Sequence, residues 1–167
     1  SNFPEFVGSY LNQETGLKLL QVYQQYRKIV GDCDEILITR NDTHTRVEYV
    51  VEGPRAGNFS AVGNFIMMFD ALRNSIPDLR GQIWLEIARD GSDSALEAFF
   101  GQRCHFSQAH NLLLLENSQL DRPNHCFNRV LHQGQMLSLQ RSCEQIAPPL
   151  TFAGLVSELI EHAFEKA

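Results

Sequence analysis

Long apolar runs, a surplus of positive charge and paired cysteines are all missing from this sequence of 167 residues. No stretch approaches the roughly 18 to 20 apolar residues of a membrane-spanning helix, and no charged-then-apolar leader opens the chain, so we expect a cytoplasmic protein with no membrane partner. The formal net charge is −6, whereas a domain that binds a nucleic-acid backbone is usually basic. We therefore do not expect this chain by itself to bind DNA.

Signatures of catalysis and of metal binding are missing as well. There is no phosphate-binding glycine loop, nucleophile elbow or zinc-protease motif, so we expect neither an enzyme nor a cofactor. The best metal candidates are the dipeptides Cys104-His105 and His125-Cys126. Neighbours on a strand point to opposite faces, so each dipeptide offers one ion only one ligand, and we expect no metal site. Because the four cysteines are scattered without CxxC spacing, we expect reduced thiols. They are Cys33, Cys104, Cys126 and Cys143.

The composition is that of an ordinary globular domain. Apolar residues make up 43% and charged residues 20%, which argues against a largely disordered chain. The length is sufficient for one domain with a hydrophobic core and short for two.

The densest apolar patterning runs from residue 81 to residue 123. Residues 81–87 alternate between apolar and polar, which predicts a half-buried strand. A short helix follows, with Asp93 or Ser92 as its cap and Gly101 at its left-handed end. We expect strands within 103–116 to form a hairpin. The four consecutive leucines of the second strand favour a central position covered on both sides.

The remaining elements complete an α+β fold. Apolar residues at helical spacing predict helices within 15–30, 60–76 and 124–145, and β-branched residues predict a hairpin of 35–40 with 45–52. Residues 3–12 favour a short strand or an arm. The sequence thus predicts a mostly antiparallel sheet of about five strands (hairpin, strand, helix, hairpin) with helices packed on it and a helical C-terminal arm.

A linker divides the chain near its C-terminal end. Two consecutive prolines in Ala147-Pro148-Pro149 cannot continue a helix. Thr151 then caps a last amphipathic helix. We therefore expect one unit over 1–146 and a linker with the start of another over 147–167.

Aromatic residues suggest a ligand pocket between the helix within 60–76 and the sheet. Apolar pockets with a cationic rim hold small organic ligands, and an arginine favours a carboxylate or a phosphate. The alternative is that the aromatic residues belong to the hydrophobic core. The candidate ligand-binding residues are Tyr49, Phe65, Met68, Phe69, Arg73 and Trp84.

The helix within 124–145 carries an apolar stripe that suggests a homodimer interface. Its candidate residues are Phe127, Val130, Leu131 and Leu137, on either side of Gly134. The alternative, which the sequence leaves equally open, is that this stripe packs on its own domain.

One series of motifs resembles a known family. It comprises Phe99-Phe100-Gly101-Gln102-Arg103-Cys104-His105-Phe106, then Asn111-Leu112-Leu113, then Leu120-Asp121-Arg122-Pro123. The series is similar to the N-terminal sensor domain, of the arabinose-binding-like type, of AraC/XylS-type bacterial transcription regulators. The resemblance covers roughly residues 8 to 145, because the earlier helix and hairpin also fall in the family's order.

The resemblance implies a function. Family members sense a small-molecule effector, form homodimers and bind promoter DNA through a C-terminal pair of helix-turn-helix units, and Phe152–Ile160 looks like the helix that opens that region. Residues 1–146 would be the ligand-sensing and dimerisation domain, and promoter DNA would be bound only through the missing C-terminal domain. The alternative is a stand-alone small-molecule-binding protein or enzyme of the cytosol, which a reading frame ending here would favour.

Overall fold

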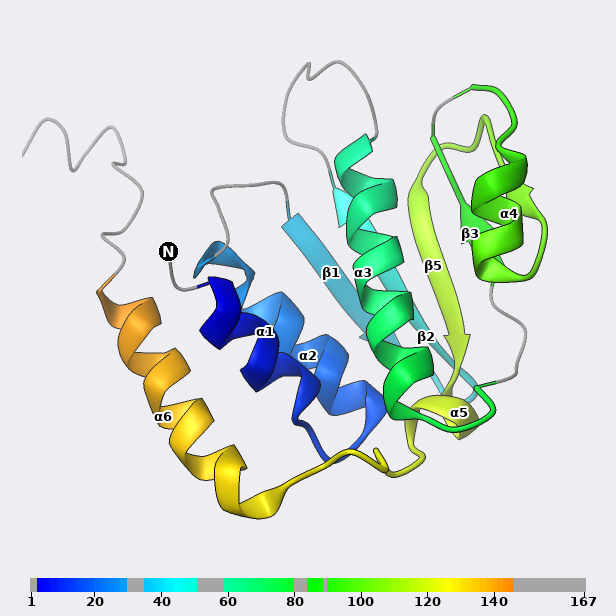
Figure 1. Cartoon of the computed structure of the whole chain (residues 1–167). Helices are drawn as coiled ribbons and strands as arrows, with labels where there is room; N and C mark the ends of the chain where they lie inside the picture. The colour runs from blue at the N-terminus through cyan, green and yellow to red at the C-terminus, as the bar shows by residue number, and fades with distance from the viewer. Residues whose placement is uncertain (1–2, 30–34, 51–58, 80–83, 89, 146–167) are drawn as a thin grey trace, which may run out of the picture.

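A five-stranded sheet with helices on one of its faces forms the centre of the computed structural model, which describes residues 3–29, 35–50, 59–79, 84–88 and 90–145 (Figure 1). The α+β class and the mostly antiparallel sheet are therefore confirmed. The strands are β1 (Glu35–Arg40), β2 (His44–Val50), β3 (Trp84–Glu86), β4 (Cys104–His105) and β5 (Asn111–Glu116). The helices are α1 (Phe3–Leu11), α2 (Gly16–Tyr26) with the 3-10 turn η1 (Arg27–Ile29), α3 (Phe59–Ser75), α4 (Ser94–Phe100), α5 (Asn117–Leu120) and α6 (Arg129–Glu144).

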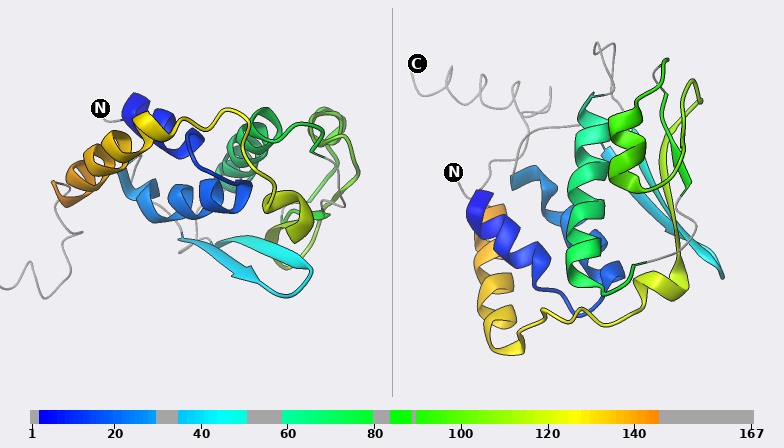
Figure 2. Two further views of the ribbon diagram at one scale, coloured as in Figure 1. Left: turned by 90° about the horizontal axis from the view of Figure 1, so that it is seen from below. Right: turned by 45° about the vertical axis from the view of Figure 1, so that its right-hand side comes forward.

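The inner face of the sheet packs against the helices. β2 runs antiparallel to β1 and β5, and its register sets Val47 opposite Ile38 and Leu113. Leu113 in turn lies opposite Leu85 of β3, so an apolar row crosses the sheet. α2, α3 and α4 cover this face, and the views in Figure 2 show no described helix on the outer face. α1 and α6 lie farther from the sheet than α2 does.

The sheet corrects two predictions about residues 103–116. The strands there do not form a hairpin, because the sheet order is β1-β2-β5-β3-β4 and β4 pairs with β3 in parallel after the α4 crossover. β5 is central, as predicted, but its outer face has no described helix over it. Leu112 on that face is only 7% exposed because Glu48 and Glu86 lie opposite it on the flanking strands.

The caps predicted for the short helix after β3 are confirmed, and Thr15 caps α2 as well. Thr15 caps α2, its hydroxyl accepting from the backbone N–H of Lys18, and Asp93 caps α4 by accepting from the N–H of Leu96 at 3.0 Å. Gly101 ends α4 in the left-handed conformation, with φ of 68°. These three residues fix both ends of α4 and the start of α2.

The N-terminal segment is a helix, so the predicted strand or arm is wrong. Phe6 and Tyr10 lie one helical turn apart, and both rings contact Tyr23 of α2, with centroids 5.7 and 5.4 Å away. Burial of these two rings against α2 stabilises a short helix whose composition by itself favours neither a helix nor a strand.

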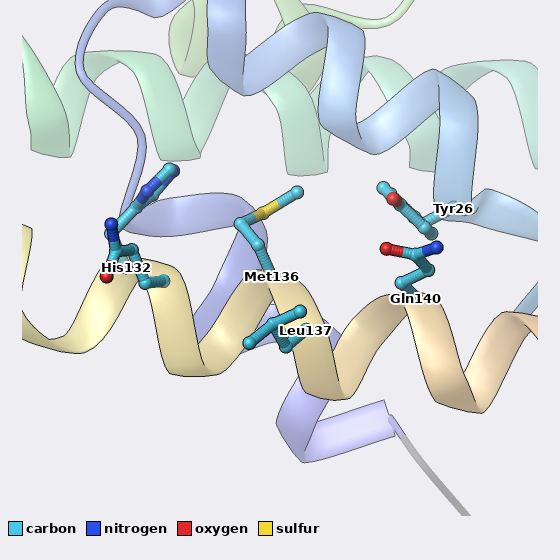
Figure 3. Close-up of a pocket in the computed structure, with 6 residues that line it drawn as sticks. Tyr26, His132, Met136, Leu137 and Gln140 are labelled. Carbon is cyan, nitrogen blue, oxygen red and sulfur yellow. The ribbon is translucent and has the colours of Figure 1, made fainter.

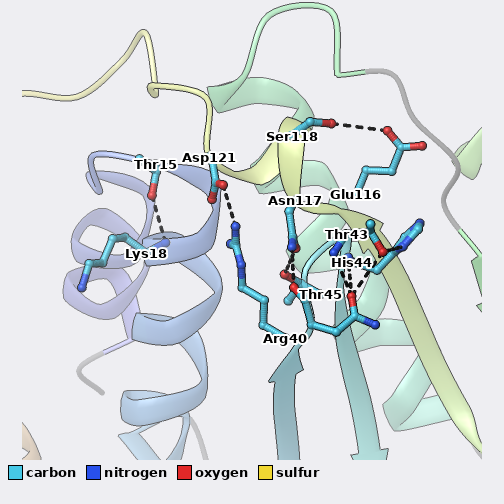
Figure 4. A network of polar contacts seen from close by, with 11 residues as sticks. Thr15, Lys18, Arg40, Thr43, His44, Thr45, Glu116, Asn117, Ser118 and Asp121 are labelled. Atoms are coloured by element: carbon cyan, nitrogen blue, oxygen red, sulfur yellow. Dashed lines mark hydrogen bonds and ion pairs between the residues drawn. The ribbon is translucent and has the colours of Figure 1, made fainter.

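Polar side chains hold the β1–β2 turn to the end of β5 (Figure 4). Asn41 accepts from the backbone N–H of His44 at 2.8 Å. Asn117, in α5, donates to the carbonyl of Asn41 at 2.7 Å and accepts from the hydroxyl of Thr45 at 2.8 Å. The turn and α5 therefore satisfy each other's polar groups where backbone pairing ends.

Several predictions concern residues outside this description. The linker and helix expected over 147–167 and the thiol of Cys33 lie there. Within the described residues, every helix is too short or too polar to cross a bilayer.

Gly16, at the start of α2, lies close to the C-terminal end of α3. A Cβ atom on Gly16 would lie 2.6 Å from Cδ1 of Ile76, 3.0 Å from Cδ2 of Leu72 and 3.2 Å from the carbonyl oxygen of Leu120. Ile76 and Leu72 are fully buried, so neither can move aside without disturbing the core.

We expect Gly16→Ala to lower the free energy of unfolding by about 1–3 kcal/mol, because the methyl group overpacks this contact. Gly63→Ala is the matched control: nothing lies within 4 Å of its Cβ position in α3. The same methyl there should raise stability by about 0.5–1 kcal/mol. Urea unfolding measures both, and equal midpoints for the two variants would contradict the close contact.

Candidate functional site

The structure separates the six residues predicted to form a ligand pocket. Tyr49, Phe65, Met68 and Phe69 are buried together in the hydrophobic core that joins α3 to the inner face of the sheet. Phe69 also packs on Phe100 of α4, with ring centroids 5.0 Å apart. Ligand binding by these four residues stays a prediction, and in this structure they fill the layer with their own side chains.

Arg73 and Trp84 lie outside that buried group. Arg73 is on the exposed side of α3, paired with Asp70 at 2.7 Å. Trp84 points to the outer face of the sheet because its neighbour Leu85 takes the inner position on β3. The indole is stacked on His105, with centroids 3.7 Å apart, and its Nε1–H donates to Glu86 at 2.9 Å. Trp84 is therefore on the opposite side of the sheet from Tyr49.

A buried arginine that the sequence patterning missed lies beside Tyr49. Arg27 is only 9% exposed. Its Nε–H donates to Oδ1 of Asn64 at 3.1 Å and its Nη2 donates to the hydroxyl of Tyr49 at 3.2 Å. The hydroxyl of Tyr23 donates to the same Asn64 oxygen at 2.5 Å. This cluster joins α2, η1, α3 and β2.

The signal for Arg27 was present in the sequence. It follows Tyr23 by four residues and so continues the buried face of α2. A guanidinium inside a fold is also the group that best pairs with a carboxylate or a phosphate. Arg27 is thus the buried cation beside Tyr49, whereas Arg73 lies at the surface.

We expect Arg27→Met to destabilise the protein by about 1–3 kcal/mol, because it removes buried hydrogen bonds to Asn64 and Tyr49. Arg73→Met removes an exposed ion pair, and the expected loss is at most about 1 kcal/mol. Thermal unfolding of the two variants compares them directly. A larger loss at Arg73 would show that the Arg27 cluster does not hold the layers together.

A chain of amide side chains holds α6 to α1. Asn12 donates from Nδ2 to the carbonyl of Asn128 at 3.0 Å and to Oε1 of Gln135 at 2.6 Å. Its Oδ1 accepts from the backbone N–H of Asn128 at 2.7 Å. Ser9 adds a bond to the Gln135 carbonyl at 3.4 Å, and Leu139 is the fully buried apolar residue of α6.

The opposite side of α6 exposes apolar residues. Val130 is 88% exposed, Leu131 55% and Leu137 57%. Phe127, just before the helix, is half-buried against His132. We call Phe127, Val130, Leu131 and Leu137 the α6 seam. The sequence allowed this stripe either to form an interface or to pack on its own domain. Val130, Leu131 and Leu137 are too exposed for packing on their own domain.

A hollow of about 400 Å³ adjoins the seam, between α6 and the end of α2 (Figure 3). Its walls combine apolar and polar side chains, with Met136 and Leu137 beside His132 and Gln140. Tyr26 closes it from the α2 side. Leu137 belongs both to this hollow and to the seam.

The two metal-candidate dipeptides lie in different places. Cys104 is buried and His105 stacks on Trp84 on the outer face, so the first dipeptide is split between faces as the alternation predicts. His125 and Cys126 are in the loop before α6. Within the described ranges, no three histidine, cysteine or acidic side chains are grouped so as to hold a metal ion.

Comparison with known proteins supplies a structural likeness. No family model matches the chain, and no curated protein sequence matches it significantly. The fold is similar to the crystal structure of the transcriptional regulator CdpR from Pseudomonas aeruginosa, with a TM-score of 0.62 and 16% sequence identity over 86% of this chain. The chain spans 49% of the length of that protein. The chain therefore shares its fold with about half of that protein.

Proposed function

We propose that this chain is the effector-sensing and dimerisation part of a bacterial transcription regulator of the AraC/XylS type. The observation that carries this proposal is the α6 seam, in which the apolar side chains of Val130, Leu131 and Leu137 are exposed. The likeness to a transcriptional regulator and the resemblance of residues 99–123 to the family's motifs support it.

The seam fits a second copy of the chain as its partner. Val130, Gly134 and Leu137 recur at steps of four and three residues, so they form one stripe along the exposed side of α6. Nothing lies within 4 Å of the Cβ position of Gly134, which leaves the middle of the stripe open to close approach by another helix. Such a dimer would set the distance between two DNA-binding units, which must meet paired half-sites together.

The effector would be a small organic molecule that changes how the sensor holds its partner. Arg27, beside Tyr49, carries the positive charge that an acidic group needs, and an effector would have to displace packed side chains to reach it, because Phe65, Met68 and Phe69 fill the same layer. Binding there would act on α2 and η1. The turn η1 contacts α6 directly, and α2 contacts α1, which in turn contacts α6.

Promoter DNA would be bound by another part of such a regulator. The net charge of −6 disfavours contact of this chain with phosphates. We therefore expect no sequence-specific retardation of a promoter fragment by this chain at physiological salt, measured by gel electrophoresis. Specific retardation would contradict this assignment.

Charging the seam should separate the two copies. We expect Leu131→Glu to convert a dimer into a folded monomer in analytical ultracentrifugation, because a carboxylate cannot be buried against an apolar partner without a large cost. The four seam residues would contribute several kcal/mol, on the order of 2 per side chain, before association costs are subtracted.

Leu37→Glu is the matched control for this experiment. Leu37 is an exposed leucine on the outer face of the sheet, away from α6, and its change should leave the dimer intact. A wild-type protein that is monomeric at all concentrations would refute dimerisation through the seam. Circular dichroism of Leu131→Glu tests whether the variant is folded. Unfolding of the variant, instead of dissociation, would assign Leu131 to the core.

A further inference from the structure

A cysteine and a histidine in the loop before α6 are placed for nucleophilic chemistry. Nε2 of His125 lies 3.3 Å from Sγ of Cys126, and Cys126 is exposed to solvent. A cysteine with a histidine at hydrogen-bond distance, itself oriented by a third group, is the arrangement by which proteins activate a thiol. Nothing in the proposed regulator function uses this pair.

The third group is the carbonyl oxygen of Ser75. It lies 2.7 Å from Nδ1 of His125 and also accepts the backbone N–H of His125 at 3.1 Å. A carbonyl oxygen only accepts hydrogen bonds, so Nδ1 of the neutral ring carries the proton. Nε2 then presents its lone pair to the Cys126 thiol. The ring is held in the one tautomer that can take up the thiol proton.

The loop that carries the pair is anchored on both sides. Asn124 donates from Nδ2 to the carbonyls of Leu11 and Gln13 at 3.0 and 2.9 Å. Its Oδ1 accepts the backbone N–H of Cys126 at 2.8 Å. With His125 tied to the end of α3, these bonds hold the His125 ring and the backbone of Cys126 in place before any reagent arrives.

The other described cysteines are less accessible. Cys104 belongs to β4 and is buried in the core, and Cys143 on α6 is half-buried against that core. Of the three cysteines that the structure describes, Cys126 is therefore the most accessible to a small reagent in solvent.

We propose that Cys126 is a modification site at which hydroperoxides oxidise the thiol to a sulfenic acid, with His125 moving the proton. Nε2 of His125 takes the thiol proton while Sγ attacks one peroxide oxygen. The S–O bond forms and the O–O bond breaks, so sulfur loses two electrons and the peroxide gains them. The imidazolium returns its proton to the leaving oxygen, which departs as water when the oxidant is hydrogen peroxide.

Hydroperoxides suit the pair better than reagents that need no proton. The hydroxide that leaves a peroxide is a poor leaving group until it is protonated, and His125 holds the required proton beside the reacting sulfur. An alkyl iodide transfers its alkyl group to sulfur and releases iodide, which needs no proton to leave. It therefore uses His125 only as the base, and the two reagents separate the two roles.

The test is the rate at which each cysteine of the whole chain reacts with hydrogen peroxide, trapped with dimedone and read by peptide mass spectrometry. His125→Asn is the decisive variant, because an asparagine side chain has an N–H that can donate to the Ser75 carbonyl but no base. We expect the Cys126 rate to fall about tenfold or more in this variant. His110→Asn, which removes an exposed histidine from the outer face of the sheet, should leave the Cys126 rate unchanged.

Iodoacetamide provides the second arm. We expect His125→Asn to slow alkylation of Cys126 less than it slows oxidation, since only oxidation needs the returned proton. Cys126 rates within twofold of each other in wild type and His125→Asn would overturn the proposal. So would equal slowing by both reagents, or faster oxidation of Cys143 than of Cys126. If His125→Asn changes the circular dichroism spectrum, His125→Gln gives the same comparison.

Discussion

Burial of one face of the sheet is the constraint on which the rest of the molecule depends. Leu113 of β5 lies between Val47 and Leu85, and α2 and α3 must approach closely enough to cover that row. Gly16 permits the approach by having no side chain where Ile76 and Leu72 converge. The outer face then has to shield the remaining leucines of β5 with long polar and aromatic side chains from the neighbouring strands, which it does for Leu112.

Local signals in the sequence predicted the elements better than their pairing. Asp93 and Gly101 act within a few residues, so their roles follow from sequence alone. The pairing of β4 depends on where the α4 crossover returns the chain, which no local pattern specifies. The first helix was missed for the same reason: Phe6 and Tyr10 gain their stability from Tyr23 on another element.

The functional residues divide in a similar way. The exposure of Val130 and Leu137 could not be predicted, because an amphipathic stripe has the same pattern whether it faces its own domain or solvent. Arg27 was overlooked because arginine counts as polar in such patterns, although here its head group satisfies Asn64 and Tyr49 inside the fold. Trp84 was predicted to line the pocket, but it lies on the outer face, stacked on His105. Alternation along a strand separates the two faces of a sheet without showing which face the helices cover.

The attachment of α6 has a consequence for how this protein can change over evolutionary time. Asn12, Asn128 and Gln135 hold the helix through its inner side, and their partners are largely backbone groups or one another. The exposed residues on the outer side take no part in these hydrogen bonds. In the dimer proposed above, substitutions on that side would change the surface offered to the partner without removing the bonds that hold the helix.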